Sequence, residues 1–299
     1  MISLIMTSLE QGFIFAVLAM GVFLTYKVLD IADLSVEGTF PMGAFVFAKF
    51  IAMGVNPIVS TLLSFGFGAL AGLVTGIFYI KLRIKPLLAG ILTMTILYST
   101  NLRIYGKANI PLFSYESIFD IGPVLVVLMV IVLLIKIILD LFLKTETGYL
   151  LIATGDNETL VRSLGANSNK YKLIGLMIAN GFVGLSGALM AQMQGFAEIT
   201  MGNSIIVVAL ASIIIGDTIG KNSSKIKNTT RAILGALVYK IIGGIAIELG
   251  LEPTDLKAIS ALIVIVFIAY NNLAADYLGR RKKEGGRNHV ENSKLIKEL

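Results

Sequence analysis

Residues 144–172, KTETGYLLIATGDNETLVRSLGANSNKYK, form a polar segment between two long apolar runs. The run before it is IGPVLVVLMVIVLLIKIILDLFL (121–143), and the run after it is LIGLMIANGFVGLSGALMAQ (173–192). Each run is long enough and apolar enough to cross a bilayer as a helix. A polar segment of this length between two spans usually contacts something in the aqueous phase, so its partner bears directly on function.

The composition extends the apolar pattern to the whole chain. Apolar residues make up 56% of the 299 residues, charged residues make up 15%, and the mean hydropathy is +0.85. A soluble protein of this size would carry more charge, so we predict an all-α polytopic membrane protein with about 8–10 transmembrane helices. The sequence has no Cys, and its one His is His289. We therefore expect no metal site, no catalytic site and no cofactor bound by this chain.

Windows of about 20 apolar residues predict the positions of the spans. There are nine such windows in the sequence: 9–27, 40–55, 58–80, 86–105, 119–143, 173–194, 204–219, 232–249 and 257–275. Some are short or rich in polar side chains, which makes them candidates for broken or re-entrant helices. Such irregular backbone survives at membrane depth only when protein buries it or when it lines a cavity. We assign residues 1–275 to one transmembrane domain and 276–299 to a basic tail.

Basic residues follow every second expected span. They are Lys27; Lys81, Arg83 and Lys85; Lys144, Arg162, Lys170 and Lys172; Lys221, Lys225, Lys227 and Arg231; and Arg280, Arg281, Lys282, Lys283 and Arg287. The opposite loops carry the acidic stretch ELGLEPTD (248–255) and only scattered bases. Because basic loops stay in the cytoplasm, we predict that 144–172, 221–231 and the C-terminal tail are cytoplasmic. The bases are spread over several loops without interleaved aromatic residues, so we expect no nucleic-acid partner.

A short helix is predicted inside the polar segment at ETLVRSL (158–164). Asp156 or Asn157 is suited to the N-cap position, and Gly165 is suited to the position just after the helix. Glu158 and Arg162 are spaced to pair along one side of this helix.

The apolar residues of this short helix are expected to share another face. They are Leu160, Val161 and Leu164. An exposed apolar face on a short cytoplasmic helix suits docking into a groove on a partner protein. The alternative is a helix that lies flat on the lipid surface.

The tract VLDIADLSVEGTFPMGA (28–44) places acidic residues between two apolar runs. One interpretation is a short cytoplasmic turn in which Asp33 or Ser35 caps the following helix. The other is a broken helix in which Ser35, Glu37 and Gly38 line a transport path. Polar side chains in or near other spans add candidates for such a path: Thr93, Thr95, Asn101 and Gln192.

The tract TGDNETLVRSLGANSNKYK (154–172), followed by a Gly-rich apolar span, resembles the coupling segment of ABC-importer permeases of the branched-chain amino acid and ribose permease group. The chain departs from that family's usual pattern at Ile152–Thr154, where Arg-Ala is common, and at Ala166, where Ile is usual. The tract IADLSVEGTFPMGA (31–44) likewise resembles a D-L-S-V-G segment of the sugar-type members, with Glu37 inserted before Gly38.

Three further tracts are similar to permease subunits of tryptophan/tyrosine-type uptake systems. They are KLRIKPLLAGILTMTILYSTNLRIYGKANIPL (81–112), ANGFVGLSGALMAQMQGFAEITMGNS (179–204) and EPTDLKAISALIV (252–264). With these tracts the resemblance runs from about residue 10 to about residue 275.

The resemblance implies a homodimeric or pseudo-dimeric permease core in the bacterial plasma membrane. Two cytoplasmic ABC ATPase subunits would bind ATP and Mg²⁺, and an extracellular solute-binding lipoprotein would deliver a small solute. The resemblance implies that this solute is an amino acid, with aromatic amino acids among the candidates. The short helix would be the coupling helix that seats in the ATPase. Its contact and shaping residues would be Asp156, Asn157, Leu160, Val161, Leu164 and Gly165.

Two other functions are weighed against an importer permease. An ion-driven secondary transporter or channel usually keeps intramembrane carboxylates, and the candidates here are Asp140, Glu198 and Asp217. A membrane enzyme would need a catalytic constellation, which the spans lack. The nearest string to a phosphate-binding loop, IGDTIGKNSS (215–224), has the wrong glycine spacing and has Asn222 where Ser or Thr is required, so we expect no ATPase activity in this chain.

Overall fold

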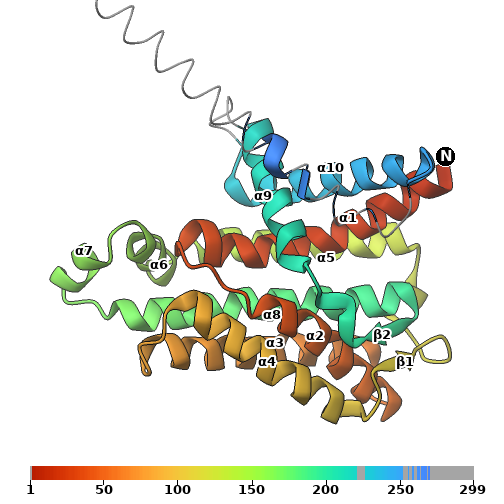
Figure 1. Ribbon diagram of the computed structural model, residues 1–299, viewed down its shortest axis with the longest axis horizontal. Coiled ribbons are helices and arrows are strands. Elements are labelled where there is room, and N and C mark those ends of the chain that lie inside the picture. Colours follow the sequence, from red (N-terminus) through yellow and green to blue (C-terminus); the bar gives the residue numbers. More distant parts are fainter. Residues whose placement is uncertain are drawn as a thin grey trace, which may run out of the picture.

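The computed structural model is a bundle of long helices with one very small sheet (Figure 1). It describes residues 2–220 and 226–251, and beyond these only positions 255, 258, 261, 262, 264–267 and 269. The ninth expected span, 257–275, and the basic tail, 276–299, therefore lie outside the described residues apart from those scattered positions.

Eight long helices make up the described bundle. They are α1 (Ile2–Phe23), α2 (Val36–Ala52), α3 (Pro57–Ile80), α4 (Pro86–Tyr105), α5 (Val124–Phe142), α8 (Ser168–Gln194), α9 (Ile205–Gly220) and α10 (Asn228–Glu248). Shorter elements connect them: a π-helical turn (Leu24–Val28), α6 (Glu146–Asp156), α7 (Glu158–Ser163) and two 3-10 turns (Ile118–Ile121 and Ile199–Gly202). Two three-residue strands, β1 (Asn109–Pro111) and β2 (Phe196–Glu198), pair antiparallel.

Seven of the described helical segments are long and apolar enough to cross a membrane. The eighth long helix, α2, has only 17 residues, as expected for the short span predicted at 40–55. The all-α polytopic prediction is confirmed. Several helix starts differ by a few residues from the expected windows. For example, α8 begins at Ser168 rather than at 173, because Asn167 caps it by accepting a hydrogen bond from the Asn169 amide at 3.1 Å.

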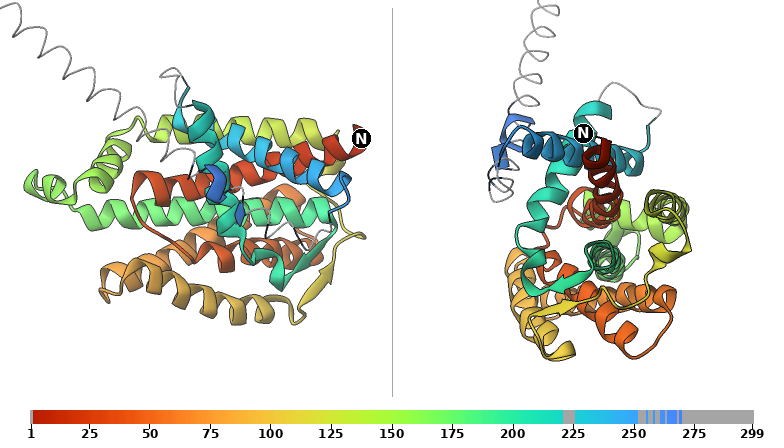
Figure 2. Two further views of the ribbon diagram at one scale, coloured as in Figure 1. Left: turned by 45° about the horizontal axis from the view of Figure 1, so that its top comes forward. Right: turned by 90° about the vertical axis from the view of Figure 1, so that its right-hand side faces the viewer.

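The helix α8 lies at the centre of the bundle and packs on α1, α2 and α3. The end-on view of Figure 2 shows α8 enclosed by its red, orange and yellow-green neighbours. Small residues permit this close approach: a Cβ atom at Gly72 would overlap the Leu176 carbonyl oxygen, and one at Gly68 would overlap that of Asn180. Gly76 is also buried on this face, so the predicted Gly68–Gly76 stripe is a helix-packing surface.

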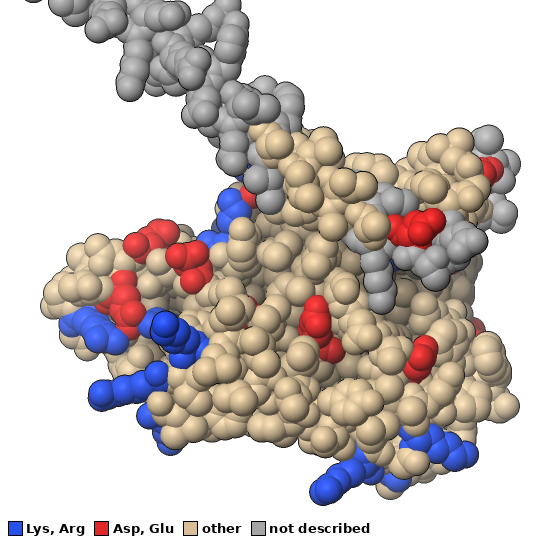
Figure 3. Space-filling view, in the orientation of Figure 1, with Lys and Arg blue, Asp and Glu red and all other residues tan. Residues whose placement is uncertain are grey.

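The basic loops that the structure describes meet at one end of the bundle, which we call the α7 end. Lys27 forms an ion pair with Asp217 at 2.7 Å, and Lys227 forms one with Asp140 at 2.9 Å. Figure 3 shows Lys and Arg side chains gathered at this end, with a smaller group at the opposite lower corner. The sheet of β1 and β2 lies at the other end, which we call the sheet end (Figure 1).

The helix α9 departs from the common direction of the bundle. It crosses the front of the molecule steeply in Figure 1 and packs against α10 and α1. Ser204 directly before it has φ of 63°, a left-handed conformation that turns the chain sharply into the helix. The sequence predicted this span as short but did not predict its direction.

Candidate functional site

The polar segment 144–172 folds into α6, α7 and the start of α8. The helix α6 was not predicted from the sequence. The sequence did carry a signal for its start, since Thr145 is a favourable N-cap residue. In the structure the Thr145 side chain accepts a hydrogen bond from the Gly148 amide at 3.1 Å. Its inner face is fixed by Leu151, which is fully buried, and by Thr154, which donates to the Leu150 carbonyl at 2.6 Å.

The predicted short helix is present as α7, with both ends capped. The Asn157 side chain accepts a hydrogen bond from the Leu160 amide at 3.1 Å, so Asn157 is the N-cap residue and Asp156 is the last residue of α6. At the other end, Gly165 has φ of 79°. Its amide donates to the Arg162 carbonyl at 3.0 Å, and the next amide, of Ala166, donates to the Val161 carbonyl at 3.2 Å. This pair of bonds is the Schellman pattern that glycine favours.

The apolar face of α7 is narrower than the sequence predicted. Leu160 is 51% exposed and Leu164 is 70% exposed, whereas Val161 is fully buried. The expectation that Val161 shares the exposed face is wrong, because one residue further along a helix turns by about 100° and points into the bundle. The exposed surface is therefore the pair Leu160 and Leu164, one helical turn apart.

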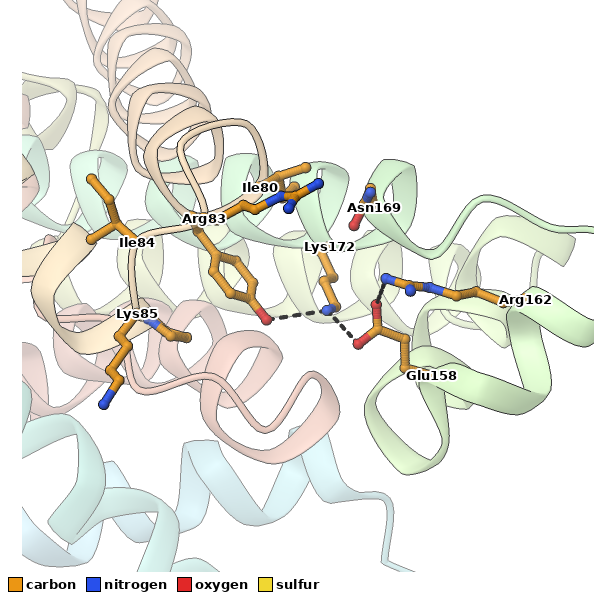
Figure 4. A pocket seen from close by; sticks show the side chains of 10 residues that line it. Ile80, Arg83, Ile84, Lys85, Glu158, Arg162, Asn169 and Lys172 are labelled. Atoms are coloured by element: carbon orange, nitrogen blue, oxygen red, sulfur yellow. Dashed lines mark hydrogen bonds and ion pairs between the residues drawn. The ribbon is translucent and has the colours of Figure 1, made fainter.

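A network of polar contacts fixes α7 to α8 and α3 (Figure 4). Glu158 accepts from the Lys172 ammonium at 2.7 Å and from the Ser168 hydroxyl at 3.0 Å, and it forms the predicted ion pair with Arg162. Lys172 also donates to the Tyr79 hydroxyl at 3.1 Å. Burial acts to raise the pKa of Glu158, but the bonds from Lys172 and Ser168 and the nearby charge of Arg162 outweigh it, so the pKa is lowered.

The tract 28–44 contains a helix break buried inside the bundle. Asp33 is 2% exposed, and one of its oxygens accepts from both the Ser35 amide, at 2.9 Å, and the Ser35 hydroxyl, at 2.6 Å. Asn180 donates to the other Asp33 oxygen at 2.8 Å, and Thr39 donates to the Asn180 oxygen at 2.8 Å. Asp33 thus fixes the turn before α2, as one of the two interpretations expected, and its side chain is buried in the bundle; the cytoplasmic position of this turn stays a prediction.

The segment 29–35, which joins the π-helical turn to α2, packs between α6 and α4. A Cβ atom at Gly155 of α6 would overlap the Val28 carbonyl oxygen, and one at Gly90 of α4 would lie 2.6 Å from the Leu34 nitrogen. Asp30 has φ of 54°, which reverses the chain after the π-helical turn. The segment thus contacts α6, next to α7, at one end and the Asp33–Asn180 cluster at the other.

The remaining pathway candidates do not share one surface in the described part of this chain. Thr93 accepts from Thr75 at 3.1 Å, and Asn101 donates to the Gly38 carbonyl at 3.1 Å, so α4 turns both side chains toward α2 and α3. The side-chain oxygen Oδ1 of Asn101 has no hydrogen-bond partner among the described residues. Thr95 lies on the exposed face of α4.

Glu37 and Gln192 occupy two further environments. Glu37 lies half-buried in the first turn of α2. Gln192 lies near the sheet end, where it accepts from the Ile118 amide and donates to the Thr61 hydroxyl, both at 3.0 Å. It also lines a cavity of about 210 Å³ with Phe113 and Tyr115. The pathway role of all seven candidates stays a prediction.

Charged groups within the spans have local partners. The predicted Lys136–Asp140 pair is present at 2.8 Å, and Asp140 also accepts from the Thr229 hydroxyl at 2.6 Å, which ties α5 to the start of α10. The Lys240 ammonium lies 3.8 Å from the centroid of the Phe15 ring. Within the described residues no group of three or more His, Cys, Asp or Glu side chains could hold a metal ion.

Comparison with known proteins identifies related chains over almost the whole length. A family model described as "Branched-chain amino acid transport system / permease component" matches residues 4–269. The chain is 47% identical over 271 residues to a tyrosine transport system permease protein of Clostridioides difficile, covering 90% of this chain and 92% of that protein. It is 25% identical to the ribose import permease protein RbsC of Escherichia coli, covering 88% and 84% respectively.

One solved structure shares the fold. PsaBC from Streptococcus pneumoniae, in complex with a Fab, aligns with a TM-score of 0.50 and 17% identity, covering 87% of this chain and 89% of that chain. At this identity the likeness concerns the fold alone.

Proposed function

The chain belongs to the permease family of branched-chain amino acid transport systems, an ABC-type family, and from that premise we propose that it is the membrane subunit of an ATP-driven importer. In this proposal its helices form the passage, and ATP and Mg²⁺ bind to separate cytoplasmic ATPase subunits. The sequence supports this division, because it has no complete phosphate-binding loop.

The exposed leucine pair on α7 is the observation that carries the proposal. Leu160 and Leu164 face outward, while Glu158 on the same helix is held by Lys172 of α8. A helix anchored on one side and apolar on the other can transmit a push or a pull to the spans behind it. We propose that Leu160 and Leu164 seat in a groove of the ATPase, with Asn157 and Gly165 fixing the ends of α7 and with Asp156 at the α6–α7 junction. Val161 then packs α7 onto the bundle and is not a contact residue.

The α7 end is assigned to the cytoplasm in this proposal. The described basic loops gather there, as the positive-inside rule expects for a cytoplasmic surface. The sheet end then faces outward and receives the solute from an extracellular binding lipoprotein. A second copy of the permease would complete the passage, and the C-terminus would be cytoplasmic.

The proposed substrate is an amino acid, with aromatic amino acids first. Support comes from the 47% identity to a protein named as a tyrosine transport permease. The direct test is uptake into proteoliposomes that contain the permease, its ATPase and its binding lipoprotein. We expect labelled tyrosine to accumulate only when ATP is supplied on the ATPase side, and accumulation to persist when a protonophore collapses the proton gradient.

An ion-driven transporter is the second candidate, and Asp33 is the observation that favours it. A buried carboxylate inside a membrane domain is the group that such transporters use to bind the coupling ion. If Asp33 has that role, uptake will stop with the protonophore and will proceed without ATP. In an ATP-driven importer Asp33 has a structural role, which its bonds to Ser35 and Asn180 support.

A further inference from the structure

We propose that the cavity between α7, the start of α8 and the α3–α4 turn binds the headgroup of an anionic phospholipid. The cavity has a volume of about 600 Å³. It is lined by one carboxylate, Glu158, and by four cationic side chains: Arg83, Lys85, Arg162 and Lys172. The charged side chains of the lining therefore sum to a net charge of +3. This site is separate from the exposed leucine pair of α7 and does not require the ATPase.

The positive charge of this cavity is only partly neutralised. Glu158 pairs with Lys172 and Arg162, and no ion pair to Arg83 or Lys85 is found among the described residues. In Figure 4 the Arg83 side chain extends toward Asn169, while Lys85 extends away from the Glu158–Lys172 pair. A phosphate group is the anion that arginine binds through paired N–H donors.

The depth of the cavity favours a lipid over a soluble anion. Tyr79 is in the last turn of α3 and Lys172 is in the second turn of α8, so the floor lies where both apolar helices end. That is the level of the headgroups in a bilayer. Basic pockets between spans at the cytoplasmic surface are known sites for acidic headgroups.

Apolar side chains beside the cavity are placed to receive acyl chains. Leu82 is 61% exposed, and Leu87 and Leu88 in the first turn of α4 are about half exposed. Ile84 and Pro86 form part of the cavity wall itself. A ligand with a phosphate at one end and apolar chains at the other matches this arrangement, whereas an acidic segment of a partner protein would leave the leucines uncovered.

Arg83 is held in an unfavourable backbone conformation. Its φ is 55°, in the left-handed region that usually takes glycine at the end of a helix. Non-glycine residues in unfavourable backbone conformations cluster at functional sites, where the side chain binds a ligand or takes part in catalysis. Since Arg83 lines the cavity, we infer that its side chain is kept for ligand binding.

The test measures lipid binding to the purified full chain in neutral detergent by native mass spectrometry. Phosphatidylglycerol, phosphatidylcholine and inorganic phosphate are titrated separately. We expect one phosphatidylglycerol molecule to bind saturably per chain, and we expect phosphatidylcholine to bind at least tenfold more weakly. The variant Arg83→Gln with Lys85→Gln is expected to bind phosphatidylglycerol about twenty-five-fold more weakly, because each of the two basic residues near a charged headgroup contributes about fivefold.

Matched controls separate this site from general charge effects. The variant Arg103→Gln with Lys107→Gln removes the same charge at the other end of α4, and it should bind like the unaltered chain. Arg83→Gly relieves the strained backbone while removing the cation, so weakened lipid binding together with unchanged or raised thermal stability supports the proposal.

Three results would overturn it. Equal weakening by both double variants means that the binding is not at this cavity. Saturable inorganic phosphate binding as tight as phosphatidylglycerol means a free-phosphate site. Loss of ATPase co-purification in Arg83→Gln with Lys85→Gln, with lipid binding unchanged, means that the cavity receives the partner protein instead.

Discussion

Two regions outside the long helices, α7 and the segment 29–35, each contain a carboxylate, and the two carboxylates lie in opposite environments. At α7, Glu158 is one-third exposed and is surrounded by cations, Lys172 and Arg162. In the segment 29–35, Asp33 is buried and accepts hydrogen bonds from neutral donors on Ser35 and Asn180. The first region exposes an apolar pair, Leu160 and Leu164, and the second keeps its polar groups buried. In the proposed function the first region is a docking element, whereas the second connects helices inside the fold.

The largest expected effect concerns the docking element. Leu160→Asp with Leu164→Asp places two charges where α7 would enter an apolar groove, so we expect co-purification of the ATPase to be lost. The permease itself should stay in the membrane at normal abundance, because both side chains are exposed. The measurement is pull-down from solubilised membranes.

The matched control adds the same two charges elsewhere on α7. Thr159 and Ser163 are exposed and one helical turn apart, so Thr159→Asp with Ser163→Asp should retain most of the ATPase. Equal loss in both variants would point to charge alone, and retention in both would contradict the docking role of the leucines.

For the buried cluster of Asp33, Ser35 and Asn180, we expect a substitution to lower the free energy of unfolding and to leave partner binding unchanged. Asp33→Ala leaves buried donors of Ser35 and Asn180 without an acceptor, which costs about 3 kcal/mol of folding free energy. Thermal unfolding in detergent should show a clear decrease in Tm. Asp156→Ala removes an exposed carboxylate and should change the folding free energy by under about 0.5 kcal/mol. Similar Tm values for the two variants would contradict the account of Asp33.

A smaller loss of stability is expected at the packing surface between α3 and α8, the helix that contacts Glu158 through Lys172 and Asp33 through Asn180. Gly72→Ala on α3 overlaps the Leu176 carbonyl of α8, so the helices must separate, at a cost of about 2 kcal/mol. Gly66→Ala serves as the control, since a Cβ atom there would meet nothing within 4 Å. A control that destabilised as much as Gly72→Ala would show that close packing is not the cause.

The smallest effect depends on pH. The pKa of Glu158 is lowered in the folded protein, so its contribution to stability is present above the unfolded pKa of about 4.3 and is lost as the pH falls through the folded pKa. Glu158→Gln should therefore cost about 1 kcal/mol at pH 7, and this cost should decrease as the pH falls below the unfolded pKa and through the folded pKa. Thermal unfolding of both proteins across this range measures the difference. A cost that does not change with pH would mean that Glu158 acts through packing.

The two regions also differ in how far the sequence could predict them. Local signals were sufficient for α7, because Asn157 and Gly165 act within a few residues of themselves. Val161 was assigned to the wrong face of α7. The segment 158–164 contains three apolar residues, and their spacing alone does not show which of them face outward. The helix α6 was missed although Thr145 marks its start, because its apolar residues were taken together with the polar segment.

The buried cluster could not be predicted, because its partners are far apart in the sequence. Asp33 and Asn180 are separated by 147 positions, and nothing local to either residue indicates the other. The same holds for Lys172 and Tyr79, which meet only once α8 packs on α3. Hydropathy located the spans well, since length and composition alone decide whether a segment can cross the bilayer.

In the proposed function, α7 is the contact through which an ATPase acts on this permease. The chain has no Cys, so Leu164→Cys gives a single attachment point for a photoactivated crosslinker in the assembled complex, and Phe113→Cys gives an exposed control at the sheet end. The account predicts a crosslink from position 164 to the ATPase and none from position 113. A complex that retains its ATPase but yields no crosslink from position 164 would contradict it.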